Sequence, residues 1–214
     1  MNLSEILSLI LSVLTVGLSA IAIIISLHQG KKQNQLALME RRLNLQQTAR
    51  SLNEALDFKN RSVLESDLKN KDGKPLLAAE FSFVLMTNSV LLESIQETAY
   101  HPLESEYQNK FLKKLEELRM ISDMFNSCFP EEIGKAYSDL TYLYVITLTK
   151  LYKYLVCLKS LDKEGININL VENNALEKRT REEYKTALNE LLKKNDEIKK
   201  LDLYNKMLKL NKIC

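Results

Sequence analysis

The stretch ILSLILSVLTVGLSAIAIIISL, residues 6–27, decides the fold because it contains no charged residue. At about 1.5 Å of rise per residue, it makes a helix roughly 33 Å long, which matches the ~30 Å hydrocarbon core of a bilayer. A buried helix of this length in a soluble protein would normally show a polar face. The polar side chains here are only Ser and Thr, whose hydroxyls can bond to their own helix backbone. The stretch therefore predicts a transmembrane helix.

A cleaved signal peptide is the alternative for this segment. Signal peptides begin with basic residues, continue with about 7–15 apolar residues and end at a small-residue cleavage site. The first five residues, MNLSE, contain no Lys or Arg, the apolar run is longer, and no cleavage-like site follows it. We therefore expect an uncleaved anchor that comprises residues 1–29.

Cations on one side of the anchor predict its orientation. The N-terminal flank has no basic side chain, whereas Lys31, Lys32, Arg41 and Arg42 follow the apolar stretch. Positive residues favour the cytoplasmic side. We expect a single-pass protein of the inner (cytoplasmic) membrane, with its N-terminus outside and residues 28–214 in the cytoplasm. The odd number of cysteines, which lack metal or redox spacing, agrees with reduced thiols.

Small side chains repeat along the anchor with spacings of 4, 3, 4, 3 and 4 residues. This period of 3.5 places them on one seam of a left-handed supercoil. Small and hydroxylated residues let membrane helices approach closely. The seam predicts self-association or docking to another membrane helix, although Ser and Thr also occur by chance in such helices. We define the seam as Ser8, Ser12, Thr15, Ser19, Ala22 and Ser26.

The rest of the chain is predicted to be all-α. Only 5 Gly and 3 Pro occur in 214 residues, which excludes collagen-like and Pro-rich disordered classes and argues against a β-sandwich. Breaks near Pro75, Pro102, Pro130 and Gly165 divide the chain into long amphipathic segments. We expect a juxtamembrane helix over 30–71 and a cytoplasmic bundle over 72–214, together about five helices. The expected bundle helices are 75–100, 103–128, 131–160 and a last one that starts near Asn173, or at Thr180 with a Thr180–Glu183 capping box.

Segment 75–100 is the most apolar part of the expected bundle. A second membrane span is the alternative, but Glu80 and Glu93 would each cost about 2.5–3.5 kcal/mol at bilayer depth. The uncharged run between them is short, so we interpret the segment as the central helix of the bundle. Buried carboxylates need partners, and we expect Glu80 and Glu93 to pair with Lys or Arg of the basic helices.

Five of the nine tyrosines lie in segment 131–160. They cannot all face the same way, so some are expected in the core and others on the surface. Tyr is favoured at protein interfaces because it supplies large contact area at low entropy cost. Tyr142, Tyr152 and Tyr154 are therefore a candidate partner surface, and half-buried core tyrosines with bonded hydroxyls are the alternative.

Charge is segregated along a chain whose net charge is only +2. Segment 31–71 and the last 22 residues each carry about four excess positive charges, whereas segment 75–130 carries a similar excess of negative ones. This pattern could pair helices within the bundle or pair neighbouring subunits. The near-neutral total and the lack of a reader motif give no support to specific nucleic-acid binding.

Catalytic motifs are absent from the sequence. We find no Gly-rich phosphate loop, no GxSxG, no HExxH and no Cys pair at zinc spacing. His101 precedes a proline in a turn, where an exposed side chain is more common than a catalytic base. We expect no catalytic residue, no cofactor and no metal.

The uncharged N-terminal span, the Lys31-Lys32 pair and the Gln-rich stretch with Glu40-Arg41-Arg42-Leu43 together resemble many uncharacterised single-pass bacterial proteins. Some of those proteins accompany phage-defence genes. The resemblance implies a bacterial inner-membrane protein and transfers no functional residue.

The leading functional hypothesis is a non-enzymatic, membrane-anchored oligomer that senses a signal or binds a cytoplasmic protein, with a role in defence or stress. The alternatives are a pore-forming effector assembled through its membrane helix and an enzyme with an unfamiliar helical active site.

Overall fold

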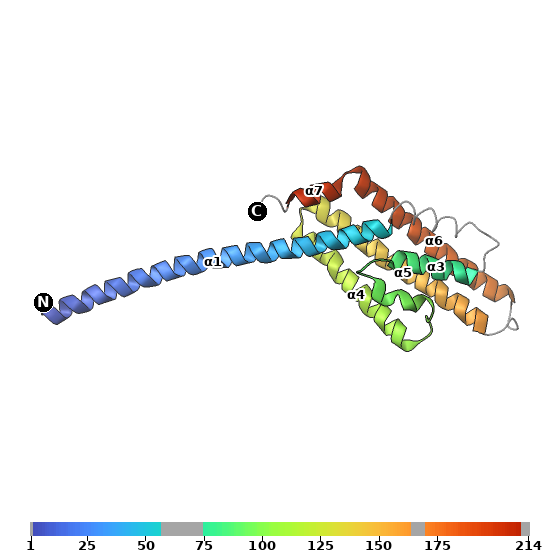
Figure 1. Ribbon diagram of the computed structural model, residues 1–214, viewed down its shortest axis with the longest axis horizontal. Helices are drawn as coiled ribbons and strands as arrows, with labels where there is room; N and C mark the ends of the chain where they lie inside the picture. The colour runs from blue at the N-terminus through green and yellow to red at the C-terminus, as the bar shows by residue number, and fades with distance from the viewer. Residues whose placement is uncertain (1, 57–74, 164–169, 211–214) are drawn as a thin grey trace. The chain divides into compact units, whose positions relative to one another are not determined.

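The computed structural model describes residues 2–56, 75–163 and 170–210, and all regular structure in these ranges is helical (Figure 1). The predicted all-α class, with one long apolar N-terminal helix followed by a helical bundle, is confirmed. The helices are α1 (Leu3–Ala55), α3 (Pro75–Thr87), the 3-10 helix η1 (Glu93–Ala99), α4 (Ser105–Cys128), α5 (Glu131–Lys163), α6 (Leu170–Lys200) and α7 (Leu203–Leu210).

The chain divides into two compact units, residues 1–42 and 43–214. Unit 1 is the larger part of α1, and unit 2 is the bundle, to which the last turns of α1 belong. The expected domain boundaries at residues 29/30 and 71/72 stay predictions, and the second lies outside the described residues, which omit 57–74.

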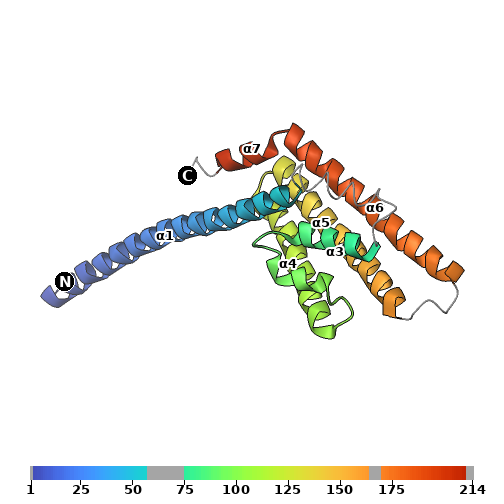
Figure 2. The ribbon, with the colours of Figure 1, turned by 45° about the vertical axis from the view of Figure 1, so that its right-hand side comes forward.

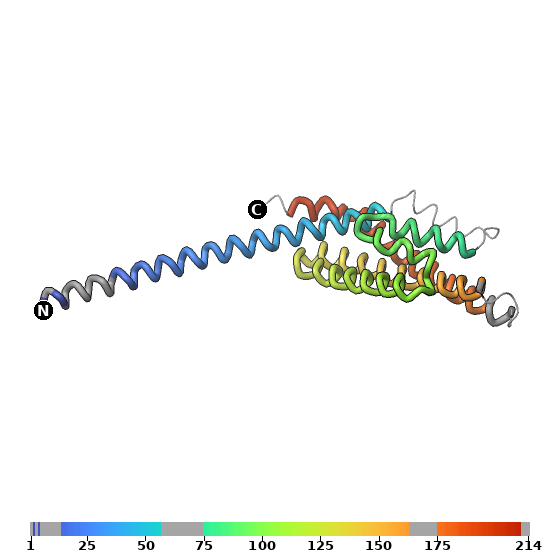
Figure 3. The backbone as a smooth tube through the Cα atoms, turned by 60° about the horizontal axis from the view of Figure 1, so that its bottom comes forward, coloured from blue at the N-terminus to red at the C-terminus, as the bar shows by residue number. Residues whose placement is uncertain are grey.

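Helix α5 is the centre of unit 2, because α3, α4, α6 and α7 all contact it. It runs antiparallel to α4, since the Phe111 ring packs on that of Tyr152 and the Phe125 ring stacks on that of Tyr137. It also runs antiparallel to α6, as the pairs Lys150–Glu183 and Asp139–Lys194 show. The turned ribbon and the backbone tube show the same neighbours (Figures 2 and 3).

Helix α4 follows directly from its amphipathic pattern. Its buried positions recur at spacings of three and four residues, which form one stripe on a helix, and they face the core of unit 2. They are Phe111, Leu115, Leu118, Ser122, Phe125 and Cys128.

The last turns of α1 are anchored in unit 2 by a similar stripe. Leu45, Ala49 and Leu52 are at most 2% exposed. The Gln46 side-chain amide donates a hydrogen bond of 3.0 Å to the Met207 carbonyl of α7. The predicted juxtamembrane helix is thus present as far as Ala55, and its continuation to residue 71 lies outside the described residues.

The prediction of one continuous helix over 75–100 was wrong. Helix α3 ends at Thr87, whose hydroxyl donates to the Phe83 carbonyl at 2.8 Å. The Ser89 carbonyl then accepts the amides of Leu92 and Glu93, which turns the chain into η1. Thr, Asn and Ser in succession at 87–89 compete for backbone hydrogen bonds, and this local competition ends the helix.

The predicted capping box at Thr180 was also wrong. Helix α6 already begins at Leu170, so Thr180 lies inside it and its hydroxyl donates to the Leu176 carbonyl at 3.0 Å. The Glu183 carboxylate, which a capping box would turn back to the helix start, instead contacts Lys150 and Arg179.

The expected last helix is interrupted once. Asp202 has a φ of 52°, the left-handed region that Asp tolerates better than most residues. Helix α6 ends at Lys200 and α7 starts at Leu203, which lets Leu203 and Met207 return to the core of unit 2.

Candidate functional site

The apolar half of α1 is exposed along its whole described length. Between residues 14 and 27, its large apolar side chains are 51–70% exposed, and α1 is the one described helix that is long and apolar enough to cross a membrane. A signal sequence near the N-terminus would meet the same criterion. Contiguous exposed apolar surface of this extent is typical of a helix that contacts a membrane or a partner. These side chains are Leu14, Val16, Leu18, Ile21, Ile23, Ile24, Ile25 and Leu27.

Four seam residues fall within the part of α1 whose side chains are described. Thr15, Ser19, Ala22 and Ser26 are all exposed. The Ser19 hydroxyl donates to the Thr15 carbonyl at 2.8 Å. Because this hydroxyl is hydrogen-bonded within its own helix, placing it in an apolar helix–helix contact leaves no unpaired donor. Ser8 and Ser12 belong to the part of α1 whose side chains the structure does not describe.

The cations that follow the apolar stretch lie on the same helix. Lys31, Lys32 and Arg41 are exposed, and Arg42 is partly buried at the end of unit 1. The exposure of Lys31, Lys32 and Arg41 would allow them to contact anionic headgroups, which attract juxtamembrane Lys and Arg by about 1 kcal/mol each.

The two carboxylates of segment 75–100 differ in their surroundings. Glu80 is 8% exposed, and its carboxylate lies 2.8 Å from the Lys159 ammonium of α5. The expected pairing of Glu80 with a cation therefore occurs, although its partner belongs to the central helix and not to the basic first or last one. The prediction that Glu93 is buried was wrong, because the chain turns before it and η1 presents it to solvent.

Only one of the three candidate surface tyrosines is on the surface. Tyr142 is 54% exposed, whereas Tyr152 and Tyr154 are buried. Tyr152 donates to the Pro102 carbonyl at 2.7 Å and Tyr154 to the Glu177 carboxylate at 3.0 Å. The two buried side chains match the alternative of core tyrosines with bonded hydroxyls, because α4 and α6 cover those sides of α5.

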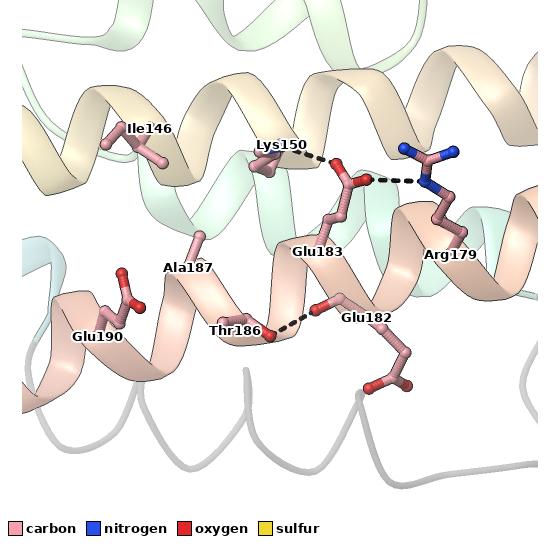
Figure 4. A pocket seen from close by; sticks show the side chains of 8 residues that line it. All are labelled: Ile146, Lys150, Arg179, Glu182, Glu183, Thr186, Ala187 and Glu190. Carbon is pink, nitrogen blue, oxygen red and sulfur yellow. Dashed lines mark hydrogen bonds and ion pairs between the residues drawn. The ribbon is translucent and has the colours of Figure 1, made fainter.

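A shallow groove of about 460 Å³ lies between α5 and α6 (Figure 4). Glu183 is at its centre, 2.7 Å from the Lys150 ammonium and 3.1 Å from the Arg179 guanidinium. The hydrogen bonds from Lys150 and then Arg179 hold the pKa of Glu183 below its ordinary value. Glu182 and Glu190 line the groove beside the apolar Ile146 and Ala187. Its lining is therefore mixed, with one acid more than bases.

Ion pairs between helices of unit 2 converge on α5. Lys194 of α6 contacts Asp139 at 2.8 Å, and Lys206 of α7 contacts Glu132 at 3.0 Å. Lysines of the basic C-terminal region thus pair with acids of α5. In these two pairs, neither acid belongs to the acidic segment 75–130. The positive charge of the C-terminal region is therefore used in part for packing within the bundle.

Several buried polar contacts gave no signal in the sequence. Tyr144 donates to the Met86 carbonyl, where α3 ends. The Ser122 hydroxyl lies 3.0 Å from that of Ser138, which also accepts from the Asn126 amide at 2.9 Å. These contacts join positions far apart along the chain, and only the packed helices bring them together.

No cluster of metal-ligating side chains occurs in the part of the chain that the structure describes. The His101 ring lies 2.8 Å from the exposed Glu104 carboxylate and stacks on Tyr107. These contacts lie within the turn between η1 and α4, where His101 is partly exposed and Glu104 is exposed.

Comparisons of the chain with protein-family models, curated proteins and solved structures found no match. Function must therefore be argued from the chain itself.

Proposed function

We propose that the chain is a non-enzymatic helical module anchored in the bacterial inner membrane by α1, with unit 2 in the cytoplasm. The module assembles into an oligomer through the seam and binds a cytoplasmic protein, in a defence or stress response. Residues 31, 32, 41 and 42 hold the orientation by their positive charge.

One observation carries the membrane assignment. The large apolar side chains of α1 from Leu14 to Leu27 are at least half exposed, with no charged residue among them. At about 25 cal/mol per Å² of apolar surface, transferring this helix from water into hydrocarbon is strongly favourable. A core helix of a soluble protein would be covered by its own chain.

The outer faces of α5 and α6 support the partner-binding part of the proposal. Tyr142 lies one turn before Ile146 on α5, and Ile146 lines the groove together with Glu182 and Glu190. An exposed aromatic beside an apolar floor and carboxylates suits a basic amphipathic segment of a partner.

Membrane fractionation tests the anchor. The full chain with a C-terminal tag should remain in the membrane pellet after alkaline carbonate extraction and keep its full mass. Deletion of residues 6–27 should release it into the soluble fraction. A full chain that is extracted by carbonate, or that is shortened at its N-terminus, would contradict the proposal.

A matched pair of variants tests the seam. Ser12→Leu with Ser19→Leu should weaken oligomers in a membrane two-hybrid assay, since bulky side chains separate helices that small ones let approach. Gly17→Leu with Ala20→Leu adds at least as much bulk on other faces of α1 and should leave the signal unchanged. Equal signals from both pairs would remove the seam from the proposal.

Purification in a mild detergent tests the partner. The mass of the particle should exceed that of one chain, and co-purified protein should decrease when Tyr142 is replaced by Ala. A monomer without a bound protein would contradict this part of the proposal.

A further inference from the structure

Helix α7 lies beside the last turns of α1, inside unit 2 (Figures 1 and 3). Gln46 of α1 is 7% exposed, and its amide donates to the Met207 carbonyl of α7 at 3.0 Å. One turn further along α1, Arg50 interacts electrostatically with Tyr204, which lies about one turn earlier in α7. The two contacts place α7 antiparallel to this part of α1. We call residues 43–55 of α1 the docked turns.

Helix α7 is a weak element by itself. Its described part has eight residues, and a helix of this length is unstable alone in water because nucleation costs more than its few hydrogen bonds return. The bend before it places Asp202 at a φ of 52°, a left-handed conformation that costs free energy in a residue other than Gly. The ion pair of Lys206 with Glu132 of α5 is about half exposed and contributes little. Burial of Leu203 and Met207, together with the contacts to the docked turns, therefore stabilises α7.

The docked turns are the part of unit 2 that continues directly into unit 1. Helix α1 is unbroken from Leu3 to Ala55, and the boundary between the two units falls inside it, at residues 42/43. A continuous helix is a rigid element that passes rotation or pull along its axis. A change that acts on unit 1 therefore reaches the turns that α7 covers.

We propose that α7 is a latch on the docked turns, which is folded while they are docked and unfolds locally when they shift. Such coupling is reciprocal, so unfolding of α7 also loosens the docked turns. Release uncovers Leu203 and Met207, and thereby changes the surface of unit 2 while α4 and α5 stay folded. The inference goes beyond the proposed function and uses contacts inside unit 2 alone, so it holds whether or not α1 crosses a membrane.

Hydrogen exchange of the full chain in detergent, measured by mass spectrometry, tests the latch. Gln46→Leu keeps the bulk of the side chain and removes the donor to α7, so amide exchange in residues 206–210 should become at least about fivefold faster. Gln47→Leu changes the exposed neighbouring side chain and should leave this rate unchanged. Residues 111–125 of α4 should exchange at the wild-type rate in both variants.

A shift of the docked turns should release α7. Ala49 is fully buried, so Ala49→Arg forces this part of α1 away from the core. We expect residues 206–210 to exchange at least about tenfold faster in this variant. Gln47→Arg adds the same side chain at an exposed position and should have no such effect. If Ala49→Arg prevents folding, Gln46→Leu and the reciprocal variant still decide.

The reciprocal variant breaks α7 from its exposed side. Lys209→Pro disrupts the helix without changing a buried side chain, whereas Lys209→Ala keeps the helix. Exchange in residues 46–55 should become at least about fivefold faster with Pro and stay unchanged with Ala. Unchanged exchange of α7 in Gln46→Leu, or of residues 46–55 in Lys209→Pro, overturns the latch. Faster exchange that extends equally to residues 111–125 also overturns it, because the bundle would then unfold as one unit.

Discussion

A single carboxylate, that of Glu80, ties the apolar helix α3 to the central helix α5. The Glu80 carboxylate lies 2.8 Å from the Lys159 ammonium, and both side chains are mostly buried. Lys159→Met leaves this charge without its partner, so we expect the free energy of unfolding to fall by about 2 kcal/mol, less than the 3–5 kcal/mol of a fully buried pair. Denaturant unfolding monitored by circular dichroism measures the loss.

Two further variants make this test specific. Lys110→Met removes a cation from the exposed pair with Glu106 and should leave the free energy of unfolding unchanged. Glu80→Gln combined with Lys159→Met removes both charges and should recover part of the loss. A double variant as unstable as Lys159→Met alone would show that the buried charge is not the cause.

The Tyr144 hydroxyl supports the point where α3 ends. It is fully buried and donates to the Met86 carbonyl, one residue before the last of α3. Tyr144→Phe removes the donor and leaves a buried carbonyl with one partner fewer, which costs about 1–2 kcal/mol of unfolding free energy. Tyr142→Phe on the exposed side of α5 is the matched control and should change nothing. Equal stability of the two variants would contradict the assigned role.

Buried tyrosines also make unit 2 sensitive to alkaline pH. Burial raises the pKa of Tyr137 from its ordinary value of 10 to about 12. The unfolded chain ionises this group near pH 10 while the folded chain keeps it neutral. Its contribution to stability is therefore complete below pH 10 and is lost as the pH rises from 10 through 12.

The Tyr137 effect is measurable as a difference between two proteins. Urea unfolding between about pH 9 and pH 12 should show a decline of up to about 1.4 kcal/mol per pH unit from this group. Tyr137→Phe should show a shallower decline over the same range. Parallel declines in both proteins would mean that Tyr137 ionises equally in the folded and unfolded states.

At the scale of elements, the joint between α4 and α5 depends on a glycine. A Cβ on Gly134 would lie 2.8 Å from the Phe125 carbonyl oxygen and 3.2 Å from the Phe129 carbonyl oxygen, both backbone atoms. Gly134→Ala should therefore lower the unfolding free energy by about 1–3 kcal/mol, although Ala favours helices by about 1 kcal/mol over Gly.

Gly30 provides the control for this substitution. It is also helical, in α1, and a Cβ there meets nothing within 4 Å. Gly30→Ala should not lower the melting temperature of the full chain in detergent. A stable Gly134→Ala protein would mean that α5 can move away from α4 at no cost.

Long periodic elements were predictable from the sequence, whereas their ends were not. The apolar residues of α1 and the buried stripe of α4 each continue over many helical turns, so the pattern predicts a helix at every position. The ends of α3 and α6 depend on local competition at Thr87 and on the left-handed Asp202, which pattern analysis does not detect. Of the candidate site residues, Tyr152 and Tyr154 were placed wrongly as surface candidates, because the side of α5 that α4 and α6 cover is set by tertiary packing.

For the whole molecule, the proposed location of unit 2 in the cytoplasm rests on a few charges. Positive residues flank only the C-terminal side of the apolar stretch, and orientation follows Lys and Arg close to the membrane more than net charge. Protease added to spheroplasts should leave a C-terminal tag intact in the wild-type chain, because the proposed orientation keeps unit 2 in the cytoplasm.

Moving the positive charge across the membrane should change this result. Lys31→Gln, Lys32→Gln and Arg41→Gln, combined with Asn2→Lys and Ser4→Lys, reverse the flanking bias without altering the apolar stretch. We expect a fraction of this variant to expose its tag to the protease, while the three Gln substitutions alone should give an intermediate fraction. A tag that is digested in the wild-type chain would place unit 2 outside the cell and would exclude a cytoplasmic partner. A tag that is protected in all three proteins would mean that the folded bundle, and not the flanking charge, sets the orientation.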